Sequence, residues 1–275
     1  SLFRAVFHLP RALLAPEYLK RGWHLLRKLK KSGIKMYSVA SNLEIIGDQK
    51  ATGLSFTSRG SRYKIEADVI ALHEGVIPNT QTGRLLNIEH QWDNSQNAFR
   101  PVLDGYGETS VAGVFAAGDN AGILGAKSAV LSGEITGCAI VEKLGFLKES
   151  ARDLIIEEAK LRRFMENGVR PMLEALYPAP DWIASAENET IICRCEEVLA
   201  GDLRKIVADG CTGPNQAKAF LRCGMGTCQG RMCASTVTEI IAKELKRLPY
   251  MVGSYNIRPP IKPISLGELA SLNEG

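Results

Sequence analysis

Four of the seven cysteines fall into two close pairs, Cys193 with Cys195 and Cys228 with Cys233. Four thiolates suit either a [2Fe-2S] cluster or a structural zinc ion, because both prefer soft sulfur ligands in a tetrahedral arrangement. Structural zinc ligands usually stand about two to four residues apart within a pair, so a C-x-C pair and a C-x4-C pair fit zinc only in part. The spacing therefore favours an iron–sulfur site, with zinc and unliganded thiols as alternatives.

The residues around the cysteine pairs add two features that favour a cluster. Glycines bracket the second pair, and they allow the backbone to approach inorganic sulfides and direct N–H groups at them. Arginines lie beside the ligands in sequence, and the helix expected after Cys233 would turn its N-terminus toward the site; both features oppose the negative charge of a cluster. The glycines are Gly224, Gly226 and Gly230, and the arginines are Arg194, Arg222 and Arg231.

The cysteine segment reads CRCEEV and then NQAKAFLRCGMGTCQGRMC. It resembles the [2Fe-2S] domain of the bacterioferritin-associated-ferredoxin (BFD) type, in the version appended to FAD-dependent oxidoreductases such as subunits of hydrogen cyanide synthase and opine oxidase and the alpha subunits of dye-linked proline and hydroxyproline dehydrogenases. The resemblance implies that Cys193, Cys195, Cys228 and Cys233 are the cluster ligands and that Cys211 and Cys223 are spare. Because Cys223 shares a loop with Cys228, replacement of a ligand or a response to oxidation is an alternative role for it.

A second motif lies earlier in the chain, from Thr109 to Asp119. It looks like the second FAD-binding motif of the pyridine-nucleotide-disulfide-oxidoreductase fold. Gly118 permits a tight turn after a buried strand, and Asp119 can accept a hydrogen bond from a flavin ribityl hydroxyl. After Gly125, a helix that begins near Ala126 would direct its positive end toward the flavin ring. The stretch 73–80 resembles another connection of the same fold.

The pyrophosphate-binding turn of a dinucleotide domain is missing, since no G-x-G-x-x-G follows a predicted strand in the first part of the chain. The chain also begins at Ser1 rather than Met. We therefore expect an N-terminal truncation that leaves the FAD site incomplete, with the resemblance covering about the last three fifths of the relatives. There is no redox C-x-x-C pair, so disulfide-reductase chemistry is not expected.

The hydrophobic pattern predicts the elements that position these motifs. Helical spacing of apolar residues predicts a helix over 15–31, and alternation predicts strands over 34–40, 54–56 and 63–65 with a turn at 58–61. Continuous apolar runs predict buried strands over 68–72 and 113–117, and helices follow over about 127–144 and 151–177. The cysteine segment is expected to hold two helices between its pairs and one after them. Prolines make residues 258–263 extended.

These elements predict an α/β protein: a three-layer FAD/NAD(P)-binding fold, incomplete at its N-terminus, followed by a small helical BFD-like [2Fe-2S] domain. We place the FAD/NAD(P)-binding part at residues 1–148 and a helical linker, broken by Pro178, Pro180 and Asp181, at residues 149–188. The cluster-binding domain takes residues 189–248. An extended proline-rich tail takes residues 249–275.

Composition excludes several classes of function. The formal net charge of +4 is too small for a broad nucleic-acid-binding field, so no nucleic-acid partner is expected. No apolar run is long enough for a membrane span and no signal peptide opens the chain, so a cytoplasmic location follows as the default.

The resemblance implies the role of an electron-transfer subunit, which relays electrons through a [2Fe-2S] cluster and FAD in an enzyme acting on amino acids, imino acids or opines. The expected partner is a substrate-oxidising flavoprotein subunit in a hetero-oligomer, and no catalytic residue is assigned in this chain. Two other functions stay open from sequence. One is a self-contained NAD(P)H-dependent flavin and iron–sulfur reductase, and the other is a non-catalytic zinc-binding module.

Overall fold

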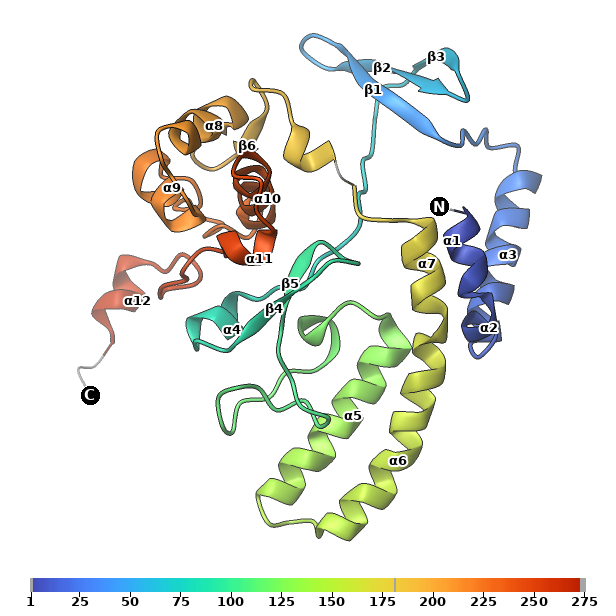
Figure 1. Ribbon diagram of the computed structural model, residues 1–275, viewed down its shortest axis with the longest axis vertical. Helices are drawn as coiled ribbons and strands as arrows, with labels where there is room; N and C mark the ends of the chain where they lie inside the picture. The colour runs from blue at the N-terminus through green and yellow to red at the C-terminus, as the bar shows by residue number, and fades with distance from the viewer. Residues whose placement is uncertain (1, 181, 273–275) are drawn as a thin grey trace. The chain divides into compact units, whose positions relative to one another are not determined.

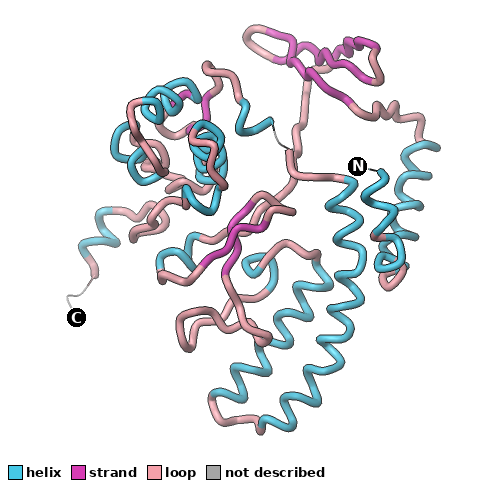
Figure 2. The backbone as a smooth tube through the Cα atoms, viewed as in Figure 1, coloured by secondary structure: helices cyan, strands magenta, loops and turns pink. Residues whose placement is uncertain are grey.

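The computed structural model describes residues 2–180 and 182–272, so Asp181 of the predicted linker and the last three residues of the predicted tail lie outside the described part. The chain divides into two compact units, one formed by residues 1–14 and 76–275 and the other by residues 15–75. Figure 1 gives the element labels used below, and Figure 2 shows how helix, strand and loop are distributed. The domain boundaries drawn from the sequence stay a prediction.

The smaller unit contains one helix and a three-stranded antiparallel meander, β1-β2-β3. The helix is confirmed as α3, and the strands β2 and β3 are joined by the predicted tight turn, in which Ser58 pairs with Ser61. Aromatic rings of Tyr37, Phe56 and Tyr63 pack on this sheet with centroids 4.8–5.6 Å apart. The elements are α3 Pro16–Lys31, β1 Ala40–Gly47, β2 Ala51–Ser58 and β3 Ser61–Glu66.

The strand predicted over 34–40 is wrong except at Ala40, because β1 begins there and pairs with β2 up to Gly47. The buried strand predicted over 68–72 is also wrong. In that stretch Val69 is 83% and Leu72 64% exposed, and no strand in the described part of the chain pairs with it. A parallel strand forms only where a neighbour satisfies its backbone N–H and C=O groups, and apolar content alone does not supply that neighbour.

The first part of the larger unit is built around an antiparallel helix pair, α5 and α6 (Figure 1). These are the predicted helices, and Leu131, Ile135, Ile156 and Ala159 form the core between them. The predicted long second helix is interrupted: α6 gives way to a 3-10 turn at Asn167–Val169 before α7. Its elements are α1 Leu2–Phe7, α2 Leu9–Ala12, α4 Gln81–Leu85, β4 His90–Asp93, β5 Ala98–Pro101, η1 Gly118–Ala121, α5 Ala126–Lys143, α6 Glu149–Glu166, η2 Asn167–Val169 and α7 Arg170–Leu176.

The buried strand predicted over 113–117 is a third error. This stretch folds back on residues 107–109: Ala116 N–H donates to Gly107 C=O at 2.9 Å, and Phe115 forms an isolated antiparallel bridge with Glu108. Local antiparallel pairing needs only a short turn, whereas a parallel strand needs a distant partner. The stretch is therefore half-buried and leads into η1 at Gly118.

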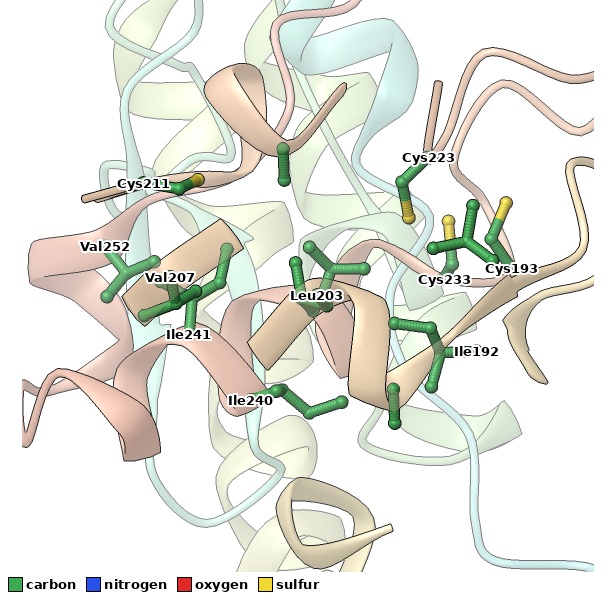
Figure 3. Packing of buried hydrophobic residues seen from close by; sticks show 14 of the residues in the cluster. Ile192, Cys193, Leu203, Val207, Cys211, Cys223, Cys233, Ile240, Ile241 and Val252 are labelled. Carbon is green, nitrogen blue, oxygen red and sulfur yellow. The ribbon is translucent and has the colours of Figure 1, made fainter. Parts of the chain in front are cut away.

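The cysteine segment forms a compact helical body, as predicted. Two helices, α8 and α9, lie between the cysteine pairs, and α10 follows Cys233. Their buried faces share one apolar core that includes Leu203, Ile240 and Ile241 (Figure 3). Its elements are η3 Trp182–Ser185, β6 Ile191–Cys193, β7 Val198–Leu199, α8 Ala200–Ala208, α9 Pro214–Leu221, α10 Ala234–Glu244, α11 Pro249–Val252 and α12 Leu266–Ala270.

Residues 258–263 lack helix and strand, as their prolines predict, whereas α12 was not expected in the tail. Ser265 caps α12: its side chain accepts from the Glu268 N–H at 3.2 Å. Among the described helices, none has the length and apolar character that crossing a membrane requires.

A buried carboxylic acid on α10 makes stability depend on pH. Burial raises the pKa of Glu239 from 4.5 to about 7, so the folded protein binds more protons than the unfolded chain between about pH 4.5 and 7. Stability is therefore highest below this window and falls as pH rises through it, by on the order of 2–3 kcal/mol. We expect Glu239→Gln to unfold at higher urea concentration than the parent at pH 8 and to match it at pH 5. An equal gain at both pH values would contradict the assignment.

Candidate metal centre

Two local structures bring the cysteine pairs to one place. The short hairpin of β6 and β7 carries Cys193 at the end of β6, and Cys195 lies in its turn. The second pair lies in the cysteine loop, the segment 222–233 between α9 and α10. Cys233 is the residue that caps the N-terminus of α10. Cys193 and Cys233 are both 1% exposed, Cys228 is half-buried and Cys195 is exposed.

Each thiol of the first pair contacts a thiol of the second. The Sγ atoms of Cys193 and Cys233 lie within 4.8 Å of each other, and Cys195 interacts with the backbone N–H and the thiol of Cys228. Burial raises the pKa of the Cys193 thiol, whereas hydrogen bonds from the Cys228 backbone N–H, the Cys228 thiol and Thr227 lower the pKa of Cys195. Cys193 and Cys233 thus form a buried contact, and Cys195 and Cys228 form a second contact nearer to the surface.

Cys223 belongs to the buried contact, although the family resemblance makes it spare. The sulfur atoms of Cys193, Cys223 and Cys233 lie within 4.8 Å of one another, and Figure 3 shows them pointing together at one end of the apolar core. Hydrogen bonding to Cys223 and burial raise the pKa of the Cys233 thiol. Cys211 lies at the other end of the core in the same view and donates to Gly213 C=O at 3.5 Å. Among the described residues, the structure therefore gathers three buried sulfurs, those of Cys193, Cys223 and Cys233, while Cys195 and Cys228 contact each other outside this group of three.

Tyr255, from the segment after α11, completes the buried group. It is 2% exposed, its hydroxyl donates to Cys223 Sγ at 3.2 Å, and it lies 3.9 Å from Cys233 Sγ. Burial raises the pKa of its phenol well above the usual range. No spacing rule connects Tyr255 with the cysteines, so sequence reasoning missed it.

The glycines of the cysteine loop have a steric role that sequence reasoning did not identify. A Cβ atom on Gly226 would lie 2.2 Å from Cys195 Cβ, and one on Gly224 or Gly230 would lie 2.8 Å from the Tyr255 ring. Gly224 also has a φ of +82°, a conformation that favours glycine. Its N–H donates to Cys193 Sγ at 3.5 Å, whereas the sequence predicts N–H groups directed at inorganic sulfides. The loop therefore approaches both Cys195 and Tyr255 at distances that only glycine permits.

Removing the hydroxyl group of Tyr255 is expected to change the reduction potential of a bound cluster. The Tyr255 hydroxyl lies 3.9 Å from Sγ of the proposed ligand Cys233. Because a hydrogen bond to ligand sulfur stabilises the reduced cluster, Tyr255→Phe should lower the reduction potential by on the order of tens of millivolts with unchanged iron content. A spectroscopic redox titration measures this. Tyr250→Phe is the control, since Tyr250 is 58% exposed. An equal shift in both variants would rule out the sulfur contact as the cause.

Two of the three predicted arginines have well-defined surroundings. Arg222 forms an ion pair with Glu196 at 2.9 Å, so its charge is largely balanced. Arg231 donates to Gln81 Oε1 at 2.5 Å and to the Ile261 C=O at 2.8 Å. Both of these acceptors are neutral, so neither cancels the positive charge of Arg231, which stands two residues before Cys233 in the sequence.

We expect Arg231→Gln to lower the reduction potential of a bound cluster by on the order of tens of millivolts, because a nearby cation stabilises the added electron. Arg231→Lys keeps the charge but not the planar guanidinium, and it should retain most of the parent potential. A redox titration of the three proteins separates the two effects. An unchanged or higher potential in a folded Arg231→Gln variant would refute the electrostatic explanation.

The predicted flavin-contacting residues meet at the start of α5. Gly118 turns the chain with a φ of +63°, and its N–H donates to Ser132 Oγ at 3.4 Å. Asp119 is exposed on η1. Gly125 precedes α5 with a φ of +103°, and no side chain in the described residues caps this helix end at Ala126. An exposed carboxylate beside an uncapped helix N-terminus fits the polar groups of a flavin.

A small cavity lies between the stretch 77–80 and the cysteine loop. It has a volume of about 200 Å³ and is lined by residues 77–80, which belong to the flavin-fold connection expected from sequence, and by Gly230 and Arg231 of the cysteine loop. A hydrogen bond from Gln81 Nε2 to the Gln229 C=O, 2.6 Å long, joins the same two segments.

Comparison with known proteins identifies two families along the chain. Residues 10–134 match the pyridine nucleotide-disulphide oxidoreductase family, and residues 187–272 match the sarcosine oxidase A3 domain. The first match confirms the predicted fold class. The solved structure of L-proline dehydrogenase from P. horikoshii has the same fold, with a TM-score of 0.66, 22% identity and coverage of 89% of this chain and 47% of that chain.

Curated relatives cover nearly the whole chain. An opine oxidase subunit of Agrobacterium tumefaciens (strain Ach5) is 43% identical over 96% of this chain and 53% of its own length. Hydrogen cyanide synthase subunit HcnB of Pseudomonas aeruginosa is 27% identical over 94% of this chain and 57% of its own length. The chain therefore spans about half the length of the curated relatives it matches.

Proposed function

We propose, on the premise that this chain is homologous to about half of an opine oxidase subunit, that it is the electron-transfer part of a flavin-dependent dehydrogenase or oxidase. The proposed substrates of the complete enzyme are opines, amino acids or imino acids, since the similar proteins include an opine oxidase, a proline dehydrogenase and a sarcosine oxidase. The proposed partner is a substrate-oxidising flavoprotein subunit. The names of the relatives, which describe subunits, support a hetero-oligomer.

The observation that carries the proposal is the contact of each first-pair thiol with a second-pair thiol. We propose Cys193, Cys195, Cys228 and Cys233 as ligands of a [2Fe-2S] cluster, which when bound would supply one-electron transfer. Cys193 and Cys233 would hold its buried side and keep water from it. Cys195 and Cys228 would hold the side nearer to solvent, where an electron acceptor can approach.

The flavin part of the proposal rests on the start of α5. The proposed FAD contacts are Gly118, Asp119, Gly125 and Ala126, with Asp119 accepting from a ribityl hydroxyl and the helix end stabilising negative charge on the reduced ring. Residues 77–80, from the stretch that resembles another connection of the flavin fold, line a cavity together with Gly230 and Arg231, which supports a flavin-binding fold next to the cysteine loop.

Anaerobic purification of the chain after expression with iron and sulfide tests the proposal. We expect a brown protein with about two iron atoms per chain and a paramagnetic resonance signal that appears on reduction. Zinc with no iron in a folded protein would overturn it in favour of a zinc-binding module. Reduction of the complete parent enzyme by NAD(P)H without any partner subunit would favour a self-contained reductase instead.

A further inference from the structure

A positively charged groove lies beside the cysteine loop. It has a volume of about 650 Å³ and is bounded by α9, by the cysteine loop and by tail residues 256–263. Lys218, Arg258 and Lys262 line it, and no acidic side chain occurs among its described lining residues. Proline rings and Met225 add apolar surface. The groove therefore combines three cations with an apolar floor, next to the loop that carries Cys228.

The three cations are available to a ligand. None of Lys218, Arg258 and Lys262 forms an ion pair with another described residue, in contrast to Arg222, which Glu196 neutralises. Arg258 and Lys262 are exposed. Lys218 Nζ lies 5.7 Å from the centroid of the Tyr255 ring, and this contact orients the ammonium group without cancelling its charge.

The walls of the groove are held together by Asn215 on α9. Its Nδ2 donates to the Ser254 C=O at 3.2 Å, and its Oδ1 accepts from the Asn256 N–H at 2.8 Å. On the other side, Arg231 donates to the Ile261 C=O at 2.8 Å. The tail backbone is thus fixed at one point on α9 and at another on the cysteine loop.

We infer that this groove docks an acidic segment of a redox partner protein, an inference that rests on the proposed electron-transfer function. Sites for small molecules usually bury most of the ligand, whereas the walls of this groove are largely exposed, which suits side chains presented by another protein. Complementary charge speeds and orients such an encounter. Gly226 lines the groove and contacts Cys195, so a docked partner would lie beside the exposed sulfurs.

Docking there has a direct consequence for electron flow. A bound cluster would supply one electron to the partner's own redox group, and no proton or bond change is required at the groove. The groove cations would hold the partner's carboxylates close to Cys195, which is exposed, and Cys228. The charged groove therefore selects the partner and the cysteine loop transfers the electron.

Binding of a fluorescein-labelled peptide of ten glutamates to the full chain, followed by fluorescence anisotropy at low salt, tests the inference. The groove variant is Lys218→Glu/Arg258→Glu/Lys262→Glu. The matched control is Lys20→Glu/Lys28→Glu/Lys31→Glu on α3, which changes the net charge by the same amount. We expect the groove variant to lose affinity by about tenfold or more and the α3 variant to stay within about twofold of the parent.

Equal losses in the two variants, or no binding to the parent, would overturn the inference. Displacement of the peptide by inorganic phosphate at equal concentration would also overturn it, because the groove would then be a site for small anions. The peptide assay does not require a bound cluster. If the chain contains no iron but still binds the peptide through the groove, the proposed function is wrong and the inferred docking surface is still supported. As a second readout, bound peptide should slow reoxidation of the reduced iron-loaded chain by ferricyanide.

Discussion

Cys195→Ala is expected to remove essentially all iron from the chain while leaving the fold intact. Cys195 is exposed and contributes nothing to the apolar core, so its thiol is dispensable for packing. As a proposed ligand, however, it supplies one of four sulfur atoms, and a cluster held by three thiolates is labile. Iron analysis and visible absorption measure the loss, and circular dichroism with thermal unfolding shows that the variant is still folded.

Cys211→Ala is the matched control, because Cys211 is 3% exposed and yet lies away from the other thiols. It should cost stability, on the order of 1 kcal/mol, and keep the iron. Cys223→Ala tests the remaining ambiguity in the buried contact. If Cys223→Ala also keeps the iron, Cys223 is spare, as the family resemblance implies. If Cys223→Ala loses iron and Cys195→Ala does not, Cys223 is a ligand and Cys195 is the spare cysteine.

The cysteine segment could be predicted well from sequence because its signals are local. Two helices were expected between the cysteine pairs and one after them, and α8, α9 and α10 lie there, because helix formation depends mainly on residues that are close in sequence. The helix after the Gly118 turn was found for the same reason. In each case the residues that determine the helix lie within the stretch from which the helix was predicted.

The failures have the opposite cause. Residues 68–72 carry the apolar run of a buried strand, but a strand depends on a partner that the run itself does not specify. Tyr255 reaches the buried thiols from the tail, through contacts with Gly224 and Gly230 that no spacing rule encodes. The sequence predicts a different role for these glycines, which is close approach of the backbone to inorganic sulfides. What they approach in the structure is the Tyr255 ring.

Gly226 offers the strongest test of how closely the loop must approach. Its Cβ in a Gly226→Ala variant would lie 2.2 Å from Cys195 Cβ, so either the loop or the turn that holds Cys195 must move. Overpacking of this kind costs about 1–3 kcal/mol. Because Gly226 has no positive φ, the cost is steric rather than conformational. We expect the variant to fold and to lose most of its iron, since the displaced Cys195 no longer shares a site with Cys228.

The control is Gly133→Ala, in the middle of α5, where an added Cβ meets no atom within 4 Å. Alanine there should stabilise the helix by up to about 1 kcal/mol and leave the iron content unchanged. Thermal unfolding and iron analysis of both variants separate stability from ligation. Full iron content in a folded Gly226→Ala variant would mean that Cys195 binds the metal from a different position or not at all. The pairing of Cys195 with Cys228, on which the proposed cluster depends, would then have to be abandoned.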